Sequence, residues 1–122
     1  MVEVLIADDN PLQRKLLTLA LSEDANIIVT AESENGEEVL RLVNEKSFDV
    51  VILDIELSKK SGIEVFRELK MQGKNIPVIM VSNYPKEDFE NAVLSMGVTC
   101  YIEKSEMPDK IIEAVNNSVR NV

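Results

Sequence analysis

Aspartate side chains follow two short apolar runs of the sequence. Asp8 and Asp9 come directly after the run 2–7, and Asp54 comes directly after the run 48–53. A continuous run of β-branched and apolar residues predicts a strand that is buried on both faces of a parallel sheet. In open α/β sheets, ligands bind just outside the carboxyl ends of the strands. These aspartates, and Asp54 above all, are therefore placed for chemistry.

Carboxylates that gather at one edge of a sheet repel each other, so the sequence predicts a bound cation. Two carboxylates about 4.5 Å apart cost roughly 3 to 4 kcal/mol at an effective dielectric constant near 20. Hard oxygen ligands favour Mg²⁺, with Mn²⁺ as a substitute, and the chain has no His and a single Cys for a soft site. The expected ligands are Asp8, Asp9, Asp54 and the backbone carbonyl of Glu56. For any one Asp alone, a turn or helix-capping role is the commoner interpretation.

Two further strand ends carry groups that suit a phosphoryl group. Ser82 follows the run 77–81 and offers a hydroxyl, and Lys104 follows the run 100–102 and offers an ammonium group. A carboxylate such as that of Asp54 can act as a nucleophile and form an aspartyl phosphate, while a metal ion and a Lys balance the charge. Taken singly, a Ser that caps a turn and a Lys in a surface ion pair are the simpler interpretations. Together they complete a phosphoryl-accepting site.

Alternating strand and helix patterns must position these groups. The predicted strands cover 2–7, 26–31, 48–53, 77–81 and 100–102. The predicted helices cover 11–23, a segment around 39–43, 62–71, a segment between Pro85 and Gly97, and 107–120. Parallel strands need helical, right-handed crossovers, which predicts an α/β fold with a five-stranded parallel sheet, strand order 2-1-3-4-5, and helices on both faces. That order makes the first and third strands neighbours, and the length predicts one domain over 1–122.

The first predicted helix is more apolar than packing on a sheet requires. One stripe consists of Leu12, Leu16, Leu19 and Ala20. Leu17 and Leu21 form a second stripe beside it and widen the apolar arc. Because this helix starts beside the acidic pair, we expect Leu17 and Leu21 to dock on a helical partner.

Charge and composition limit the partners and the compartment. The formal net charge is −9 and no basic cluster is present, which argues against direct contact with nucleic acid. Cys100 is alone, so it has no partner for an internal disulfide and fits a reducing compartment. No apolar run is long enough to cross a bilayer, and no signal-peptide pattern follows Met1. We therefore expect a cytoplasmic protein without direct membrane or nucleic-acid contacts.

Over its whole length the sequence resembles the receiver domains of two-component response regulators, the CheY-like superfamily. The matched positions are the metal-binding pair Asp8 and Asp9, the phosphoacceptor Asp54, the hydroxyl of Ser82, the switch aromatic Tyr101 and the phosphate-binding Lys104. The resemblance implies Mg²⁺-dependent transfer of a phosphoryl group to Asp54 from a sensor histidine kinase or a phosphotransfer protein. It also implies that Ser82 and Tyr101 switch a partner-binding surface. Such a domain is a signalling module and catalyses only its own phosphorylation and dephosphorylation.

The sequence departs from the family's pattern close to the acceptor. Asn83 stands where a small residue is usual, and Tyr84 and Glu56 flank the same approach to the acceptor. We therefore expect slow hydrolysis of the aspartyl phosphate. Ser105 stands where most receivers have a Pro, commonly with a cis peptide bond. A cis bond before a residue other than Pro costs about 2.5 to 4 kcal/mol, which leaves the shape of this loop open.

Two other functions fit the same residues less well. Asp8 and Asp9 would repel the phosphate of a flavin, and a phosphatase with an Asp nucleophile normally needs a second Asp where this chain has Asn10. A pseudo-receiver that binds partners without phosphorylation stays open, and a Mg²⁺-dependent phosphodonor assay separates it from a receiver. The downstream partner is either an effector protein or an output domain fused beyond Val122, and a homodimer formed on phosphorylation is also open.

Overall fold

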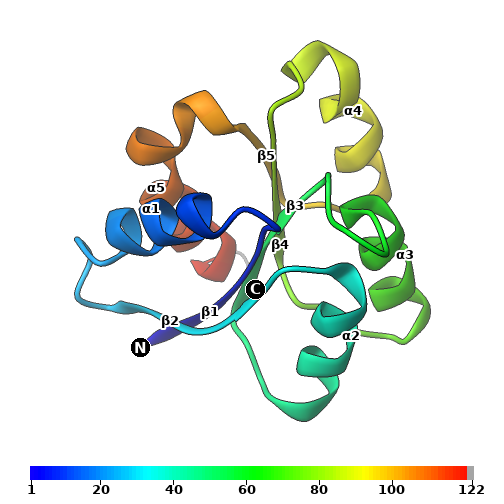
Figure 1. Cartoon of the computed structure of the whole chain (residues 1–122), viewed down its shortest axis with the longest axis horizontal. Coiled ribbons are helices and arrows are strands. Elements are labelled where there is room, and N and C mark those ends of the chain that lie inside the picture. The colour runs from blue at the N-terminus through cyan, green and yellow to red at the C-terminus, as the bar shows by residue number, and fades with distance from the viewer. Residues whose placement is uncertain (121–122) are drawn as a thin grey trace.

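A computed structural model describes residues 1–120 as a parallel sheet with helices on both faces (Figure 1). The strands are β1 (Val2–Ala7), β2 (Ile27–Ser33), β3 (Val50–Asp54), β4 (Val78–Ser82) and β5 (Cys100–Glu103). The helices are α1 (Pro11–Leu21), α2 (Gly36–Glu45), α3 (Gly62–Met71), α4 (Lys86–Met96) and α5 (Met107–Arg120), with a 3₁₀ turn η1 (Lys104–Glu106) before α5. All strand pairs are parallel and the order is β2-β1-β3-β4-β5, which confirms the predicted fold.

The helices divide between the two faces of the sheet (Figure 1). α1 and α5 cover one face, and α2, α3 and α4 cover the other. Every residue of β3 and β4 is buried, because both faces of these central strands are covered. Successive residues of β3 point to opposite faces of the sheet: Ile52 packs on the face covered by α1 and α5, and Leu53 packs on the face covered by α2, α3 and α4. None of the helices described within residues 1–120 has the length and apolar character of a membrane span.

The first helix turns the other leucine stripe towards the sheet. Leu17 and Leu21 are only 3% and 1% exposed, whereas Leu12, Leu16 and Leu19 are 63%, 52% and 57% exposed. The prediction that Leu17 and Leu21 form a docking surface is therefore wrong. The two stripes adjoin on the helix and both consist of apolar residues, so periodicity alone does not decide which of them faces the sheet. Packing of α1 against the distant helix α5 as well as the sheet fixes the rotation.

The edge strand β2 carries one extra residue. Val4 pairs with Val29 and Leu5 pairs with Ala31, so Thr30 is a bulge without a partner residue on β1. The bulge changes the side to which the strand's residues point: Val29 packs on the α1 and α5 side, and Ala31 packs on the opposite side. The Thr30 hydroxyl is buried, and within the described chain it has no hydrogen-bond partner.

Two glycines let the loop after β3 close tightly. The N–H of Gly36, at the start of α2, donates to the carbonyl of Ser58 at 3.1 Å. A Cβ atom at Gly36 would meet the backbone of this loop, and a Cβ atom at Gly62 would collide with the carbonyl oxygen of Asp54. The loop therefore lies against both the start of α2 and the end of β3.

Candidate functional site

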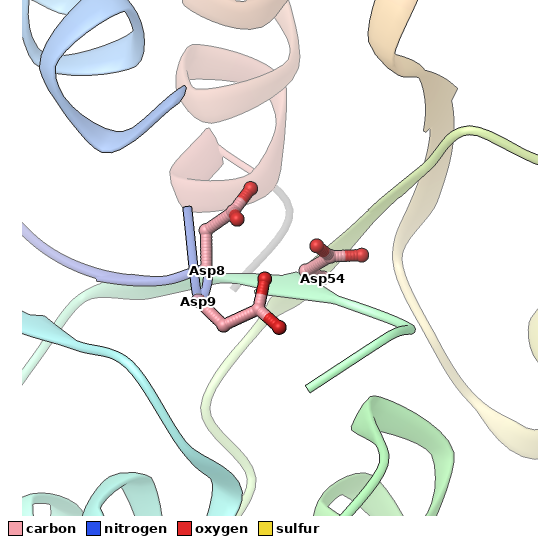
Figure 2. Close-up of side chains that lie close together, drawn as sticks. All are labelled: Asp8, Asp9 and Asp54. Carbon is pink, nitrogen blue, oxygen red and sulfur yellow. The ribbon is translucent and has the colours of Figure 1, made fainter. Parts of the chain in front are cut away.

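The aspartates singled out in the sequence meet where β1 and β3 end (Figure 2). Asp8 and Asp9 follow β1 and Asp54 ends β3, and one carboxylate oxygen of each lies within 4.8 Å of the others. Asp8 and Asp54 are buried, whereas Asp9 is exposed. The side chains come together because the strand order makes β1 and β3 neighbours.

Backbone N–H groups orient the two buried carboxylates. The N–H of Asn10 donates to Oδ1 of Asp8 at 2.9 Å, and the N–H of Glu56 donates to Oδ1 of Asp54 at 3.0 Å. Each donor lies two residues after its Asp, so each Asp also closes a turn. The turn role and the site role are therefore compatible, since each turn uses only one oxygen of its carboxylate.

Lys104 joins the two buried carboxylates. Its Nζ lies 2.8 Å from Oδ2 of Asp54 and 3.0 Å from Oδ2 of Asp8, and its side chain is 8% exposed. Burial alone lowers the pKa of Lys104, but the hydrogen bonds to Asp54 and Asp8 outweigh it and the pKa is raised. Burial raises the pKa of Asp54, and Lys104 offsets only part of that effect. One ammonium group leaves the three-carboxylate cluster with a net negative charge.

The donor atoms of this cluster fit a hard divalent cation. The converging ligand atoms are carboxylate oxygens, and the single Cys of the chain lies on β5, two strands away from β3. Mg²⁺ in proteins commonly takes one or two carboxylates and keeps several waters, which suits a cluster with an exposed member such as Asp9. Asp8, Asp9 and Asp54 would hold the ion, and the carbonyl of Glu56 remains a predicted ligand.

Ser82 and Tyr101 are linked through one residue of the loop after β4, Tyr84. The buried Oγ of Ser82 accepts the N–H of Tyr84 at 2.9 Å, and the carbonyl of Tyr84 accepts the hydroxyl of Tyr101 at 2.7 Å. Tyr101 is 3% exposed, and burial raises the pKa of its phenol. The resemblance gives Tyr101 the role of a switch aromatic. In the structure its ring lies inside the protein, where its hydroxyl has a backbone acceptor.

The side chains expected around the approach to Asp54 lie at the surface. Glu56, Asn83 and Tyr84 are all exposed, and the Tyr84 ring lies against the ring of Phe89 at 5.0 Å between centroids. Their influence on hydrolysis remains a prediction. In the loop after β5, the peptide bond before Ser105 is trans, as is every other peptide bond in residues 1–120.

One contact beside the cluster was missed in the sequence. The guanidinium of Arg14 donates from Nη1 to the carbonyl oxygen of Asp8 at 2.6 Å and pairs through Nε with Oε1 of Glu32 at 3.0 Å. Arg14 lies six residues after Asp8, within the first half of α1. A basic residue near the start of the helix that follows an acidic strand end is the only signal that the sequence contains.

Comparison with known proteins identifies the family. Residues 4–116 match the family model of the response regulator receiver domain. The transcriptional regulatory protein DegU of Brevibacillus brevis is 31% identical over 93% of this chain and 48% of its own length. A protein-glutamate methylesterase/protein-glutamine glutaminase of Halalkalibacterium halodurans is 35% identical over 88% of this chain and 31% of its own length. The chain thus spans about half or less of these curated relatives.

Solved structures agree in fold along nearly the whole chain. The receiver domain of Francisella response regulator 1452 is 28% identical with a TM-score of 0.88, covering 99% of this chain and 98% of that chain. The signal receiver domain of NarL from Mycobacterium tuberculosis is 24% identical with a TM-score of 0.91, covering 99% and 98%, and supports the fold alone. With the family match over 4–116, the chain belongs to the response regulator receiver domain family.

Proposed function

We propose that this receiver domain, taken as one unit over 1–122, accepts a phosphoryl group on Asp54 in a Mg²⁺-dependent reaction. The donor would be a sensor histidine kinase or a phosphotransfer protein. The observation that carries the proposal is a buried carboxylate at the end of the central strand, bonded to Lys104 and grouped with Asp8 and Asp9. The relatives include a transcriptional regulator and a methylesterase, so the output function differs among proteins that share this domain.

In the proposed transfer, Asp54 acts as the nucleophile. Its carboxylate oxygen forms a bond to phosphorus while the bond between phosphorus and the donor's imidazole nitrogen breaks, and that nitrogen keeps the electron pair and takes up a proton. A Mg²⁺ ion, which Asp8, Asp9 and Asp54 would hold, would neutralise negative charge on the transferring phosphoryl group. Lys104, already 2.8 Å from Oδ2 of Asp54, is placed to follow the new charge onto a phosphoryl oxygen. The N–H of Glu56 keeps the other oxygen, Oδ1, in place during transfer.

The switch would act through the backbone of Tyr84. A phosphoryl group brings about 1.5 to 2 negative charges and new acceptor oxygens to Asp54. If the Ser82 hydroxyl turns to one of these oxygens, the N–H of Tyr84 loses its acceptor. The carbonyl of the same residue holds the hydroxyl of Tyr101, so a change in the loop reaches β5. We propose that this alters the surface formed by α4, β5 and α5, which would bind an effector, a fused output domain or a second copy.

The exposed stripe of α1 is the proposed docking surface for the phosphodonor. It consists of Leu12, Leu16 and Leu19, which replace the buried Leu17 and Leu21 in that role. Next to this stripe is a cavity of about 130 Å³, lined among others by Leu16, Lys104, Met107 and Pro108. The docking surface therefore continues to the Lys that contacts Asp54, which is where a donor His must arrive.

A small-molecule phosphodonor tests the acceptor. We expect the native protein to gain the mass of one phosphoryl group with acetyl phosphate and Mg²⁺, and to gain none with EDTA or after Asp54→Asn. Native protein that stays unmodified under these conditions would favour the pseudo-receiver. Modification of Asp54→Asn would place the acceptor elsewhere.

Kinase-mediated transfer tests the docking surface. Leu16→Ser should slow transfer from the kinase and leave modification by acetyl phosphate unchanged, because only the former needs the α1 surface. Leu94→Ser on α4 is the matched control, since Leu94 is also an exposed leucine, at 41% against 52% for Leu16. Equal kinase rates for both variants would contradict docking at α1.

A further inference from the structure

A guanidinium group holds the peptide that joins the two aspartates after β1. The side chain of Arg14 is 17% exposed and reaches back from α1 to the carbonyl oxygen of Asp8 at 2.6 Å. Its Nε is paired at 3.0 Å with Glu32 on β2. The planar fork of an Arg side chain allows one residue to bind both acceptors at once.

The backbone of Asp8 is held from both sides. Its N–H donates to the carbonyl of Ser33 at 3.0 Å, and its C=O accepts from Arg14, which is paired with Glu32 next to Ser33 on β2. Because a peptide unit is planar, a fixed C=O of Asp8 also fixes the direction of the N–H and Cα of Asp9. The edge strand β2 and the helix α1 therefore together set the direction in which the side chain of Asp9 leaves the backbone.

We propose that Arg14 is a positioning residue for the divalent cation. It orients the peptide between Asp8 and Asp9 so that the exposed Asp9 carboxylate stays close to Asp8 and Asp54, and Glu32 keeps the guanidinium in place. The inference rests on the proposed function, in which these three aspartates hold the ion. It adds a residue that contacts neither the ion nor the phosphoryl group.

Charge and geometry predict opposite effects at this position. A cationic side chain near a cation site repels the incoming ion, so an effect of charge alone means that removal of Arg14 tightens metal binding. A positioning role means that removal of Arg14 weakens metal binding, because Asp9 then samples directions away from the other carboxylates. The sign of the change in Kd therefore distinguishes the two.

The test is Mn²⁺ binding to the folded, metal-free protein, measured by the loss of the free-ion EPR signal. We expect Arg14→Met to raise the Kd for Mn²⁺ by about tenfold, the usual scale for groups that orient metal ligands. Arg14→Lys should raise it as well, since an ammonium group keeps the charge but cannot bridge both acceptors in the fork geometry. Glu32→Gln should raise it less. Arg41→Met is the matched control, because Arg41 lies on α2 and pairs there with Glu38 and Glu45.

A second measurement needs no metal. In NMR spectra of the EDTA-treated protein, the backbone amide signals of Asp9 and Asn10 should shift in Arg14→Lys and Glu32→Gln and stay in place in Arg41→Met. If Arg14→Met does not fold, Arg14→Lys and Glu32→Gln provide the test.

Three results would overturn the positioning role. They are a Kd that is unchanged or lower in Arg14→Met, a native Kd in Arg14→Lys, and Asp9 amide signals that do not respond. If the native protein binds Mn²⁺ and the variants match it, only the role of Arg14 fails. If the native protein binds no Mn²⁺, the proposed metal site fails and the positioning role falls with it.

Discussion

Removal of the Lys104 ammonium group should show how much this group contributes to neutralising the acidic cluster. In the variant Lys104→Met, the apolar stem is largely kept and the ammonium group that lies 2.8 Å from Asp54 and 3.0 Å from Asp8 is lost. Both carboxylates remain almost fully buried, with side chains 2% and 3% exposed. The variant therefore leaves two buried carboxylates without their ion-pair partner.

The structure gives the scale of the effect. Carboxylate oxygens within 4.8 Å of each other repel by about 3.5 kcal/mol at an effective dielectric constant near 20. Removal of one partner from a buried ion pair costs about 3 to 5 kcal/mol. We expect a loss of about 3 kcal/mol in the free energy of unfolding of the metal-free protein near pH 7. For a domain of this size, that is a fall of about 12 °C in Tm.

Two conditions should remove most of the stability loss of Lys104→Met. Saturating Mg²⁺ supplies the missing positive charge, and a low pH protonates Asp54 and so removes negative charge from the cluster. Burial raises the pKa of Asp54 above its ordinary value of 3.8, and loss of Lys104 removes a contact that lowers it. An acid with a raised pKa binds its proton more tightly in the native state, so its stability contribution falls as pH rises above 3.8. The deficit of Lys104→Met should thus be small near pH 4 and full near pH 7.

Urea unfolding followed by circular dichroism, with EDTA or with Mg²⁺, measures these differences. Lys110→Met is the matched control, because Lys110 is 55% exposed and pairs with Glu106 at the surface, so its loss should cost about 1 kcal/mol or less. A deficit in Lys104→Met that is equal with and without Mg²⁺ and at both pH values would refute the reasoning. It would assign the loss to packing of the stem instead of charge.

Further predictions concern the metal, the lifetime and the switch. Millimolar Mg²⁺ should raise the Tm of the native protein, and Asp9→Asn should largely abolish that rise; an equal rise in scanning calorimetry would contradict the ligand role. Asn83→Ala should speed loss of phosphate from Asp54 several-fold in a radiolabel decay assay; an unchanged rate would show that this exposed side chain does not shield the acceptor. Beryllium fluoride should shift NMR signals around Tyr101 in the native protein and not in Ser82→Ala; equal remote shifts would disprove the coupling.

Most of the architecture could be predicted because it depends on local patterns. The helix predicted over 62–71 is α3 (Gly62–Met71), which lies between a capping Ser61 and Gly73. The run 77–81 predicted β4 to within one residue, because a strand with both faces covered is apolar throughout. The juxtaposition of the aspartates follows from strand order alone, so it was also accessible.

The features that could not be predicted depend on contacts between distant segments. Which leucine stripe of α1 faces the sheet is decided by α5, far along the chain. Tyr101 lies inside because a carbonyl on the loop after β4 accepts its hydroxyl. Arg14 binds the carbonyl of Asp8, and backbone carbonyls leave no trace in a sequence. The orientation of α1, the position of Tyr101 and the contact of Arg14 all depend on three-dimensional contacts, which a pattern of residue types does not specify.

The bulge at Thr30 also makes the length of β2 adjustable at one position. Since Val29 pairs with Val4 and Ala31 with Leu5, removal of Thr30 would join two halves that are already in phase with β1. A deletion inside a strand normally sends every following side chain to the wrong face, but here it would restore simple alternation. The same deletion would discard a buried hydroxyl that has no partner in the described chain. β2 should therefore tolerate the loss of Thr30 better than the loss of Val29 or Ala31, because either of those deletions keeps the register but puts Thr30 in the place of an apolar residue that packs on the core.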